Sequence, residues 1–468
     1  MASSLNLIHV ARVTPSSDSG ESVTLPLTFF DALWLKFPPV ERLIFYPLTT
    51  ATRPYFDSVI VPNLKASLSH TLSHYLPLAG RLVLDSLDAN PRLVYSANDA
   101  VSLTVAEYDA DFSHLSGDGP RCATELYPLV PELHISDDSA SAVSFQVTLF
   151  PDQGFCIGVS AHHAVLDGKT ATMFLKAWAH ISKQRQHEEP NNFDLSLPQD
   201  LIPFYDRTVI NAPPELMSEV LNTWFYFVEK FSGDVDKAKP LNLNLIPFPE
   251  IGSDVLRYTF ELTRGDLQTL RDRVMTESPP EVNSKELRLS TFVLAFSYAF
   301  ACMVKARGGD PKRPVGYGFA VDCRKIFDPP IPGNYFGNCV SGGLKLNLTA
   351  EKFLGEKGFV TAVKMVSDTV AGLDPKVGVK IPEILRGYMS VRPGTQLLSV
   401  AGSTRFGVYG LDIGWGRPVK VEIVSIDHGE SISMAESRDG SGGVEIGFSL
   451  KKHEMDVLIP LLRHGLKN

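Results

Sequence analysis

Residues 155–168 read FCIGVSAHHAVLDG: an apolar run, two histidines, a short apolar spacer, an aspartate and a glycine. Phe155, Ile157 and Val159 suit a strand that is buried on at least one face. An imidazole at the end of a buried strand can act as a general base at neutral pH. Asp167 can fold back to hold the local backbone, and Gly168 permits a turn that a residue with a Cβ would resist.

The histidine pair has two other interpretations. Such a pair near a buried strand is often a hydrogen-bonded part of the core. A metal site would use His162, His163 and Asp167 as ligands. Adjacent residues of an extended strand point to opposite faces, however, so the two rings rarely share one ion. The sequence offers no second cluster of His, Cys or Glu with ligand spacing, and we therefore expect no metal.

Composition excludes several classes of protein. The chain has 468 residues, 44% of them hydrophobic, which suits two or three globular domains with sizeable cores. The formal net charge is -9, and no basic stripe of the kind that nucleic-acid binding requires is visible. An anionic ligand must therefore be met by a local patch of positive charge rather than by the field of the whole protein.

The cysteines and the apolar segments indicate the compartment. Five scattered cysteines favour reduced thiols in the cytosol over a disulfide framework. The N-terminal segment is too weakly apolar for a secretory signal. The longest apolar stretch, residues 290–304, is shorter than the roughly 20 residues needed to span a bilayer. We therefore expect a cytoplasmic protein that does not enter a membrane.

Helices and strands alternate along the sequence without a regular βαβ period or an internal repeat, which predicts an α/β protein with mixed sheets. A polar segment over 183–215 is expected to be a linker between two halves. The expected strands are 7–13, 40–46, 101–106, 142–150, 256–262, 315–321, 419–426, 431–436 and 443–450. The expected helices are 63–76, 170–181, 264–275, 290–304, 356–372 and 451–466.

The start of the apolar helix is a candidate anion site. Ser290 suits the N-cap, and with Thr291 it begins a helix whose first turn offers free N–H groups and the positive end of the helix dipole. Arg271 and other cations lie nearby in the sequence. We expect this segment to bind a phosphate or pyrophosphate, although any capped helix has the same appearance.

Two further motifs stand out. Residues 409–418 (YGLDIGWGRP) place glycines on both sides of Trp415 and an aspartate, Asp412, before them, which predicts a tight turn that fixes the indole. Residues 335–339 (YFGNC) combine an aromatic pair and a glycine with a polar amide.

Together these motifs carry a resemblance. Residues 163–167 (HAVLD) match the HxxxD motif of the plant BAHD acyltransferases, and residues 412–416 (DIGWG) match their DFGWG motif with Ile413 in place of the usual Phe. Residues 335–339 match the YFGNC motif of the branch that acylates anthocyanins and other phenolic glycosides, often with malonyl. The chain thus resembles the anthocyanin and phenolic glucoside malonyltransferases over its whole length.

The resemblance implies a fold and a set of substrates. It implies a monomer of two chloramphenicol-acetyltransferase-like domains with a channel between them, in which His163 would lie. The first domain would span 1–205 and be completed by about 417–453, and the second would span 216–416 and be completed by about 454–468. The co-substrate would be an acyl-CoA, malonyl-CoA in this branch, and the acceptor a phenolic or flavonoid glucoside, with no bound cofactor.

The chemistry of acyl transfer assigns roles to the motif residues. His163 would remove the proton of a hydroxyl as its oxygen attacks the thioester. Trp415 Nε1–H or a backbone N–H could stabilise the oxyanion. Nothing in the sequence resembles a nucleophile elbow, so no acyl-enzyme is expected. The resemblance further implies that Asp167 points away from the substrate and pairs with Arg324, and Asp412 is expected to be an architectural acceptor.

Three alternatives remain open. Residues 162–168 fit the motif of peptide-synthetase condensation domains equally well, and a non-catalytic homologue could keep the fold. The third alternative is the same enzyme with a hydroxycinnamoyl-CoA donor. Malonyl differs from hydroxycinnamoyl in carrying a carboxylate, which needs a cation when buried. Arg392, Arg405 and Arg417 are the candidates for this cation in the sequence.

Overall fold

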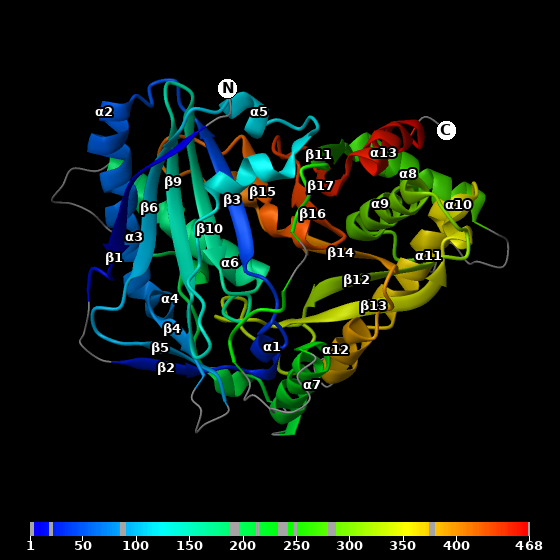
Figure 1. Ribbon diagram of the computed structural model, residues 1–468, viewed down its shortest axis with the longest axis horizontal. Coiled ribbons are helices and arrows are strands. Elements are labelled where there is room, and N and C mark those ends of the chain that lie inside the picture. The colour runs from blue at the N-terminus through cyan, green and yellow to red at the C-terminus, as the bar shows by residue number, and fades with distance from the viewer. Residues whose placement is uncertain are drawn as a thin grey trace.

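The computed structural model describes residues 4–17, 22–84, 90–187, 196–211, 213, 215–232, 242–247, 250–278, 287–373 and 380–466. Figure 1 shows two α/β halves side by side, each built around its own large mixed sheet. The predicted fold class is therefore confirmed. No helix within the described ranges has both the length and the apolar character that crossing a membrane demands.

The first half is built on a six-stranded sheet, which supplies the strand before the histidine pair. In spatial order its strands are β1 (Leu5–Val13), β6 (Val101–Tyr108), β9 (Val143–Phe150), β10 (Gly154–Ala161), β3 (Val40–Pro47) and β15 (Lys420–Ile423). Every residue of β9 and β10 is buried, and the two strands pair antiparallel without a break in register. Phe155, Ile157 and Val159 face the main core, whereas Cys156 faces a smaller cluster on the other side of the sheet.

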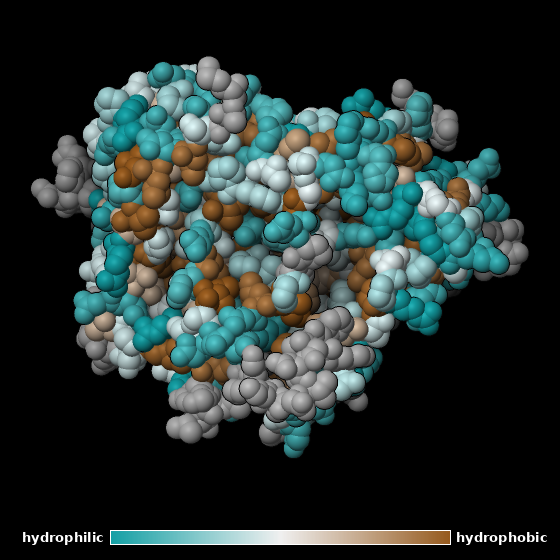
Figure 2. Space-filling model, in the orientation of Figure 1, coloured by the Kyte–Doolittle hydropathy of each residue, from teal (hydrophilic) through white to brown (hydrophobic). Residues whose placement is uncertain are grey.

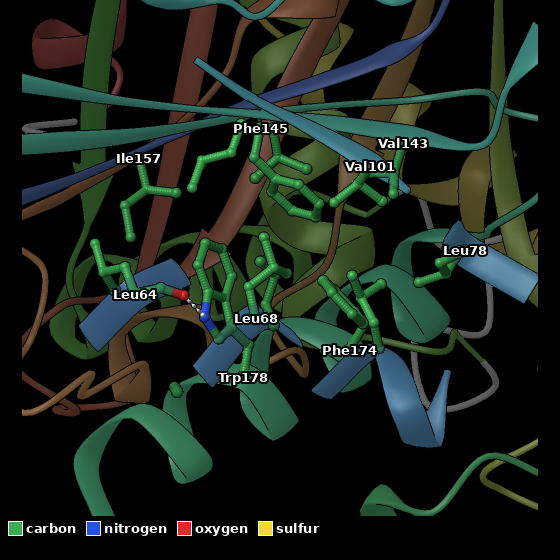
Figure 3. Packing of buried hydrophobic residues seen from close by; sticks show 14 of the residues in the cluster. Leu64, Leu68, Leu78, Val101, Val143, Phe145, Ile157, Phe174 and Trp178 are labelled. Atoms are coloured by element: carbon green, nitrogen blue, oxygen red, sulfur yellow. Dashed lines mark hydrogen bonds between the residues drawn. The ribbon is translucent and has the colours of Figure 1, made fainter. Parts of the chain in front are cut away.

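Two helices cover the core face of this sheet, α3 (Val61–His74) and α6 (Gly168–His187). Figure 3 shows Trp178 and Phe174 of α6 beneath the strands, with Leu64 and Leu68 of α3 beside them. The indole Nε1–H of Trp178 donates to the carbonyl oxygen of Leu64 over 3.3 Å, so the buried ring keeps a partner for its one polar atom. This packing fixes α6 against β10 and with it the turn that joins them.

A small four-stranded sheet and several short helices complete the first half. The strands are β2 (Val23–Pro26), β5 (Arg92–Tyr95), β4 (Arg81–Val83) and β8 (Ser139–Ser141). The helices are α1 (Phe29–Ala32), α2 (Arg53–Tyr55), α4 (Leu76–Ala79) and α5 (Phe112–Leu115).

The second half is built on a seven-stranded sheet. Its strands, in spatial order, are β13 (Val340–Thr349), β12 (Pro314–Asp322), β14 (Gln396–Gly402), β16 (Ser431–Glu436), β17 (Val444–Lys451), β11 (Val255–Leu262) and β7 (Arg121–Cys122). The helices of this half are α8 (Arg264–Glu277), α9 (Thr291–Arg307), α10 (Glu351–Leu354), α11 (Gly358–Ala371) and α13 (Lys452–His464). α9 is buried almost throughout, which explains its uniformly apolar sequence.

The last strands correct one expectation. We expected residues 417–453 to complete the first domain, but only β15 joins the first sheet, where it pairs with β3. β16 and β17 form an antiparallel pair within the second sheet, next to β14 and β11. The reason is the 3-10 turn over Val424–His428, which ends β15 at Ile423, three residues before the end of the predicted strand, and leads the chain out of the first sheet.

The predicted linker is also partly wrong. α6 continues to His187, so residues 183–187 are helical, and Gln199–Leu201 and Arg207–Val209 form 3-10 turns. Residues 188–195, 212 and 214 lie outside the described part of the chain. The segment is followed by α7 (Glu215–Ser232), which packs against α12 (Ile381–Met389) at the bottom of Figure 1. Because α7 also contacts α1 of the first half and α12 contacts β13 of the second, this helix pair joins the two halves near the linker.

A buried cluster of charges joins the two large sheets. Glu422 of β15 contacts Arg121 of β7, and it accepts a hydrogen bond of 2.8 Å from Arg257 of β11. Lys420 lies 3.6 Å from the same carboxylate. Burial raises the pKa of Glu422, but Arg121, Lys420 and Arg257 together hold it well below its usual range. The carboxylate of the first sheet thus balances the cations of the second.

We expect Glu422→Gln to lower the free energy of unfolding by about 3–5 kcal/mol, because it leaves the buried guanidinium of Arg121 without its counter-charge, whereas Arg257 keeps Asp427 at 2.6 Å. Since the pKa of Glu422 is lower in the folded state, this stabilisation is present at neutral pH and is lost as the pH falls through the acidic range. Urea denaturation at several pH values measures it. Asp57→Asn, which breaks an exposed pair with Arg53, is the control and should cost about 1 kcal/mol or less.

Candidate active site

His163 lies in the turn between β10 and α6. β10 ends at Ala161, and Val165 N donates a hydrogen bond of 2.9 Å to the carbonyl of His162, which closes the turn. The imidazole of His163 stacks on the indole of Trp34, with ring centroids 4.0 Å apart and an interplanar angle of 5°. The stacking fixes the plane of a ring that stands at the end of a rigid strand.

The electrostatics of the turn keep both histidines neutral. Burial lowers the pKa of His163 to about 4, and the opposing effects of its own backbone carbonyl and of Asp167 are smaller. Burial lowers the pKa of His162 to about 3. His162 Nδ1 accepts a hydrogen bond of 3.2 Å from Ala164 N, which gives this ring a local structural role. At neutral pH, His163 therefore has a free lone pair with which to accept a proton.

Asp167 is fully engaged by protein groups. Its Oδ1 accepts a hydrogen bond of 2.8 Å from Thr170 N, in the first turn of α6. Its Oδ2 lies 2.8 Å from Arg324 Nη1 and accepts a second hydrogen bond, of 3.1 Å, from Cys339 N. Both Asp167 and Arg324 are 1% exposed. This carboxylate therefore holds the turn and a loop of the second half together, and it is not oriented to carry protons.

Arg324 extends this contact into the loop of residues 335–339. Its Nη2 donates to the hydroxyl of Thr170 at 3.1 Å and to the carbonyls of Tyr335 and Gly337 at 3.3 and 3.2 Å. Burial lowers the pKa of Arg324, but Asp167 raises it above its usual value. The guanidinium thus stays charged and fixes the loop against the start of α6.

A second carboxylate, which the sequence analysis missed, holds the same loop from the other side. Asp31 is fully buried, and its Oδ1 accepts hydrogen bonds from Asn338 N and Nδ2 at 2.8 and 3.1 Å. Asn338 Nδ2 also donates to the carbonyl of His163 over 3.0 Å. Arg207 donates to Tyr335 Oη over 2.6 Å and lies 3.4 Å from Asp31. The backbone of His163 is therefore positioned by the YFGNC motif.

Gly337 is required by this arrangement. Its φ of +123° lies in the left-handed region, and a Cβ at this position would lie 2.2 Å from Arg207 Nη1.

The signal for Asp31 was present in the sequence: Thr28 and Asp31 form a capping box at the start of α1, with Thr28 N donating to Asp31 Oδ2 over 2.9 Å.

Asp412 organises a turn at some distance from His163. Its Oδ1 accepts hydrogen bonds from Gly414 N and Gly416 N, and its Oδ2 lies 2.6 Å from Lys183 Nζ near the end of α6. Burial raises the pKa of Asp412, but the bonds from Lys183 and Gly414 hold it below its usual range. These contacts fit an architectural acceptor.

The position of Trp415 rules out a direct role beside His163. Its ring packs edge-on against Phe155, with ring centroids 6.0 Å apart, and its Nε1–H donates to Tyr55 Oη over 3.1 Å. Phe155 is the second residue of β10, and the strand ends at Ala161, two residues before His163; the two strand positions are about 20 Å apart at ~3.3 Å per residue. Trp415 as oxyanion donor is therefore wrong: the turn lies at the far end of the strand.

The predicted phosphate or pyrophosphate site at the start of α9, which would serve CoA, remains a prediction. Ser290 is the N-cap of α9, as expected, and its hydroxyl accepts a hydrogen bond from Val293 N. Thr291 is the first residue of the helix. Arg271 donates to the carbonyl of Leu289 over 3.1 Å, so the cation lies directly beside the cap.

For metals, no three His, Cys, Asp or Glu side chains within the described residues lie close enough to share an ion.

Comparison with known proteins identifies the family. The model of the Transferase family matches residues 3–214 and 252–459. The chain belongs to this family, that of the BAHD acyltransferases. As a BAHD protein it is an acyl-CoA-dependent acyltransferase, and this membership favours that interpretation of the histidine motif over a peptide-synthetase condensation domain.

Several curated BAHD relatives match the whole chain. Phenolic glucoside malonyltransferase 1 of Arabidopsis thaliana is 65% identical, covering 100% of this chain and 99% of that protein. The malonyl-CoA:anthocyanidin 5-O-glucoside-6''-O-malonyltransferase of the same plant is 50% identical, with 99% of each chain covered. The agmatine coumaroyltransferase of Arabidopsis thaliana is 44% identical, and the match covers 99% of this chain and 100% of that protein. The crystal structure of vinorine synthase, 21% identical, covers 98% of both chains with a TM-score of 0.70 and shares the fold.

We expect Asp167→Asn to lower the free energy of unfolding by about 3–5 kcal/mol, because it leaves the buried Arg324 with only the partly exposed Asp322 as a counter-charge. Asp412→Asn is the matched comparison. Its pair with Lys183 is partly exposed, so its loss should cost about 1 kcal/mol. Urea denaturation measures both. An Asp167→Asn protein of unchanged stability but without activity would assign Asp167 to the chemistry instead.

Proposed function

We propose that this BAHD protein transfers malonyl from malonyl-CoA to a sugar hydroxyl of a phenolic or flavonoid glucoside, with His163 as the general base. The observation that carries the proposal is the neutral imidazole of His163 at the end of β10. Its backbone is held by Asn338, and its turn is held by Asp167. A base that is neutral and fixed in place suits deprotonation of an alcohol.

The reaction needs no covalent intermediate. His163 takes the proton of the acceptor hydroxyl while its oxygen attacks the thioester carbonyl. The tetrahedral intermediate then collapses, the C–S bond breaks, and the imidazolium returns the proton to the CoA thiolate. Asp167 and Arg324 position the turn, and Asp412 positions the distant end of α6; none of the three carries a proton in this scheme.

The names of the relatives support the donor and the acceptor. A relative that is 65% identical is a phenolic glucoside malonyltransferase, and one that is 50% identical malonylates an anthocyanidin glucoside. A coumaroyltransferase at 44% identity keeps a hydroxycinnamoyl donor as the second candidate. The acyl pocket, rather than overall identity, must therefore decide between the two donors.

We also propose how the protein is organised around this reaction. Residues 1–205 and 216–416 would form the main parts of two domains, with the substrate channel between them and Ser290, Thr291 and Arg271 contacting CoA. Figure 2 shows hydrophobic side chains gathered near the middle of the face where the two halves meet, which suits an aromatic acceptor.

All five cysteines are free thiols, which supports a cytoplasmic location. We further propose that the protein acts as a monomer and has no nucleic-acid or membrane partners.

We expect His163→Ala to lower turnover by about 10²- to 10⁴-fold while the protein still folds and binds acyl-CoA. His162→Gln is a control for the neighbouring ring and should affect stability more than the chemical step.

Because the pKa of His163 is about 4, log(kcat/KM) of the wild type should stay level from pH 8 down to pH 5.5. A fall centred near the usual histidine value of about 6.5 would contradict a base with this lowered pKa.

A donor panel tests the proposed substrate. With one flavonoid glucoside as acceptor, kcat/KM is measured for malonyl-, acetyl- and coumaroyl-CoA, and the products are identified by their mass. We expect malonyl-CoA to be preferred. A preference for coumaroyl-CoA would overturn the malonyl assignment while leaving acyl transfer in place, and no transfer from any of the three donors would overturn the enzyme assignment itself.

A further inference from the structure

Arg42 of β3 differs from the other deeply buried arginines. Among the described residues, Arg121, Arg257 and Arg324 each contact a buried carboxylate. Arg42 is only 4% exposed, yet its one side-chain hydrogen bond within that part of the chain is from Nη1 to the neutral hydroxyl of Thr172, over 3.2 Å. A buried guanidinium without a counter-charge is costly, so a protein keeps one where a ligand supplies the charge.

The acidic group whose charge acts on Arg42 is Glu436, and its oxygens are engaged elsewhere. Burial lowers the pKa of Arg42 to about 10, and the charge of Glu436 only partly offsets this effect. The two carboxylate oxygens of Glu436 accept hydrogen bonds from Gly407 N and Tyr409 N at 3.2 and 3.0 Å. Glu436 therefore holds the backbone of another loop and leaves the guanidinium of Arg42 available.

Arg42 lines two neighbouring cavities. The first lies between β3, β9, β10 and the first turns of α6, and we call it the inner cavity. The second lies between the two large sheets and is lined by Phe406, Lys420 and Glu422 among others. The two adjoin near Gly168, where a Cβ would lie 2.8 Å from the ring of Phe406.

The inner cavity lies beside the proposed catalytic turn. Ala161 and Leu166 line it, and they flank the histidine pair in the chain. Most of its other walls are apolar, including Val143 on the sheet and Phe174 on the helix beneath, both labelled in Figure 3. Its two ionisable side chains are Arg42 and Asp167, and the carboxylate of Asp167 is taken up by Arg324, Thr170 and Cys339.

We propose that Arg42 holds the carboxylate of the malonyl group in this inner cavity and thereby selects the donor; the inference rests on the proposed malonyl transfer. The planar guanidinium can bind both carboxylate oxygens, and the negative charge of the ligand is the counter-charge to Arg42. An acetyl group leaves the guanidinium unpaired, and a coumaroyl group places an uncharged ring against it.

Arg42 takes the place of the three arginines that the sequence suggested for this role. Arg392, Arg405 and Arg417 are all exposed, so water screens their charge and weakens any discrimination between donors. Arg417 also belongs to the turn at the far end of β10, close to Trp415 and distant from His163. Arg42 combines burial with a position beside the catalytic turn.

The test measures the ratio of kcat/KM for malonyl-CoA to that for acetyl-CoA, with one phenolic glucoside. We expect Arg42→Gln to lower this ratio by about 10²-fold, as for the loss of one partner of a buried charge pair, and Arg42→Lys to lower it by less. Arg392→Gln, Arg405→Gln and Arg417→Gln are the controls and should leave the ratio as in the wild type.

The outcomes separate this inference from the function on which it rests. A wild-type enzyme that does not prefer malonyl-CoA overturns the proposed function and the inference together. A wild type that prefers malonyl-CoA, with a folded Arg42→Gln variant of unchanged ratio, overturns the role of Arg42 alone. If Arg42→Gln does not fold, the ratio in Arg42→Lys decides: a wild-type ratio overturns the role, and a lowered ratio supports it. A lowered ratio in one of the three control variants instead would move the role to that arginine.

Discussion

The buried ion pair between Asp167 and Arg324 is the contact on which the rest of the site depends. It joins the first turn of α6, in the first half, to the loop that follows β12, in the second. Removing water from two charges costs several kcal/mol per ion, so such a pair is sustained only where further hydrogen bonds complete both groups. Here Thr170 N, Cys339 N and the loop carbonyls complete them. The pair therefore holds the two halves together beside the turn that carries His163.

The same principle distinguishes structural charges from a charge that a ligand can use. Asp31, Asp167, Arg324 and Glu422 are buried with protein partners and act as fixed connections between segments distant in sequence. Burial lowers the pKa of His163, and its backbone carbonyl accepts a hydrogen bond from Asn338, as the proposed role of general base requires. Arg42 alone among the buried arginines of the described residues faces cavities without an acidic partner, which is why its charge is better explained by a substrate than by the fold.

Local patterns predicted much of the architecture. Alternation of apolar residues located β10, the N-cap Ser290 located α9, and the glycines around Trp415 located the turn at 412–416. Each of these features depends on residues within one or two turns of chain. The placement of β16 and β17 in the second sheet could not be read in this way, because a strand pattern shows which face is buried and not which sheet it joins.

The sequence by itself determined the motif set, and with it the family, the candidate base His163 and the acidic residue four positions later. Only the tertiary structure decided how these residues are used. It separated Trp415 from His163 by the length of β10, lowered the pKa of His163 by burial, and added Asp31 and Arg207 to the site. It also placed Arg42 beside the proposed catalytic turn with a hydroxyl, and not a carboxylate, as its hydrogen-bond partner. The physical reason is that desolvation and charge pairing depend on contacts between segments that lie far apart in the chain, and no local pattern records them.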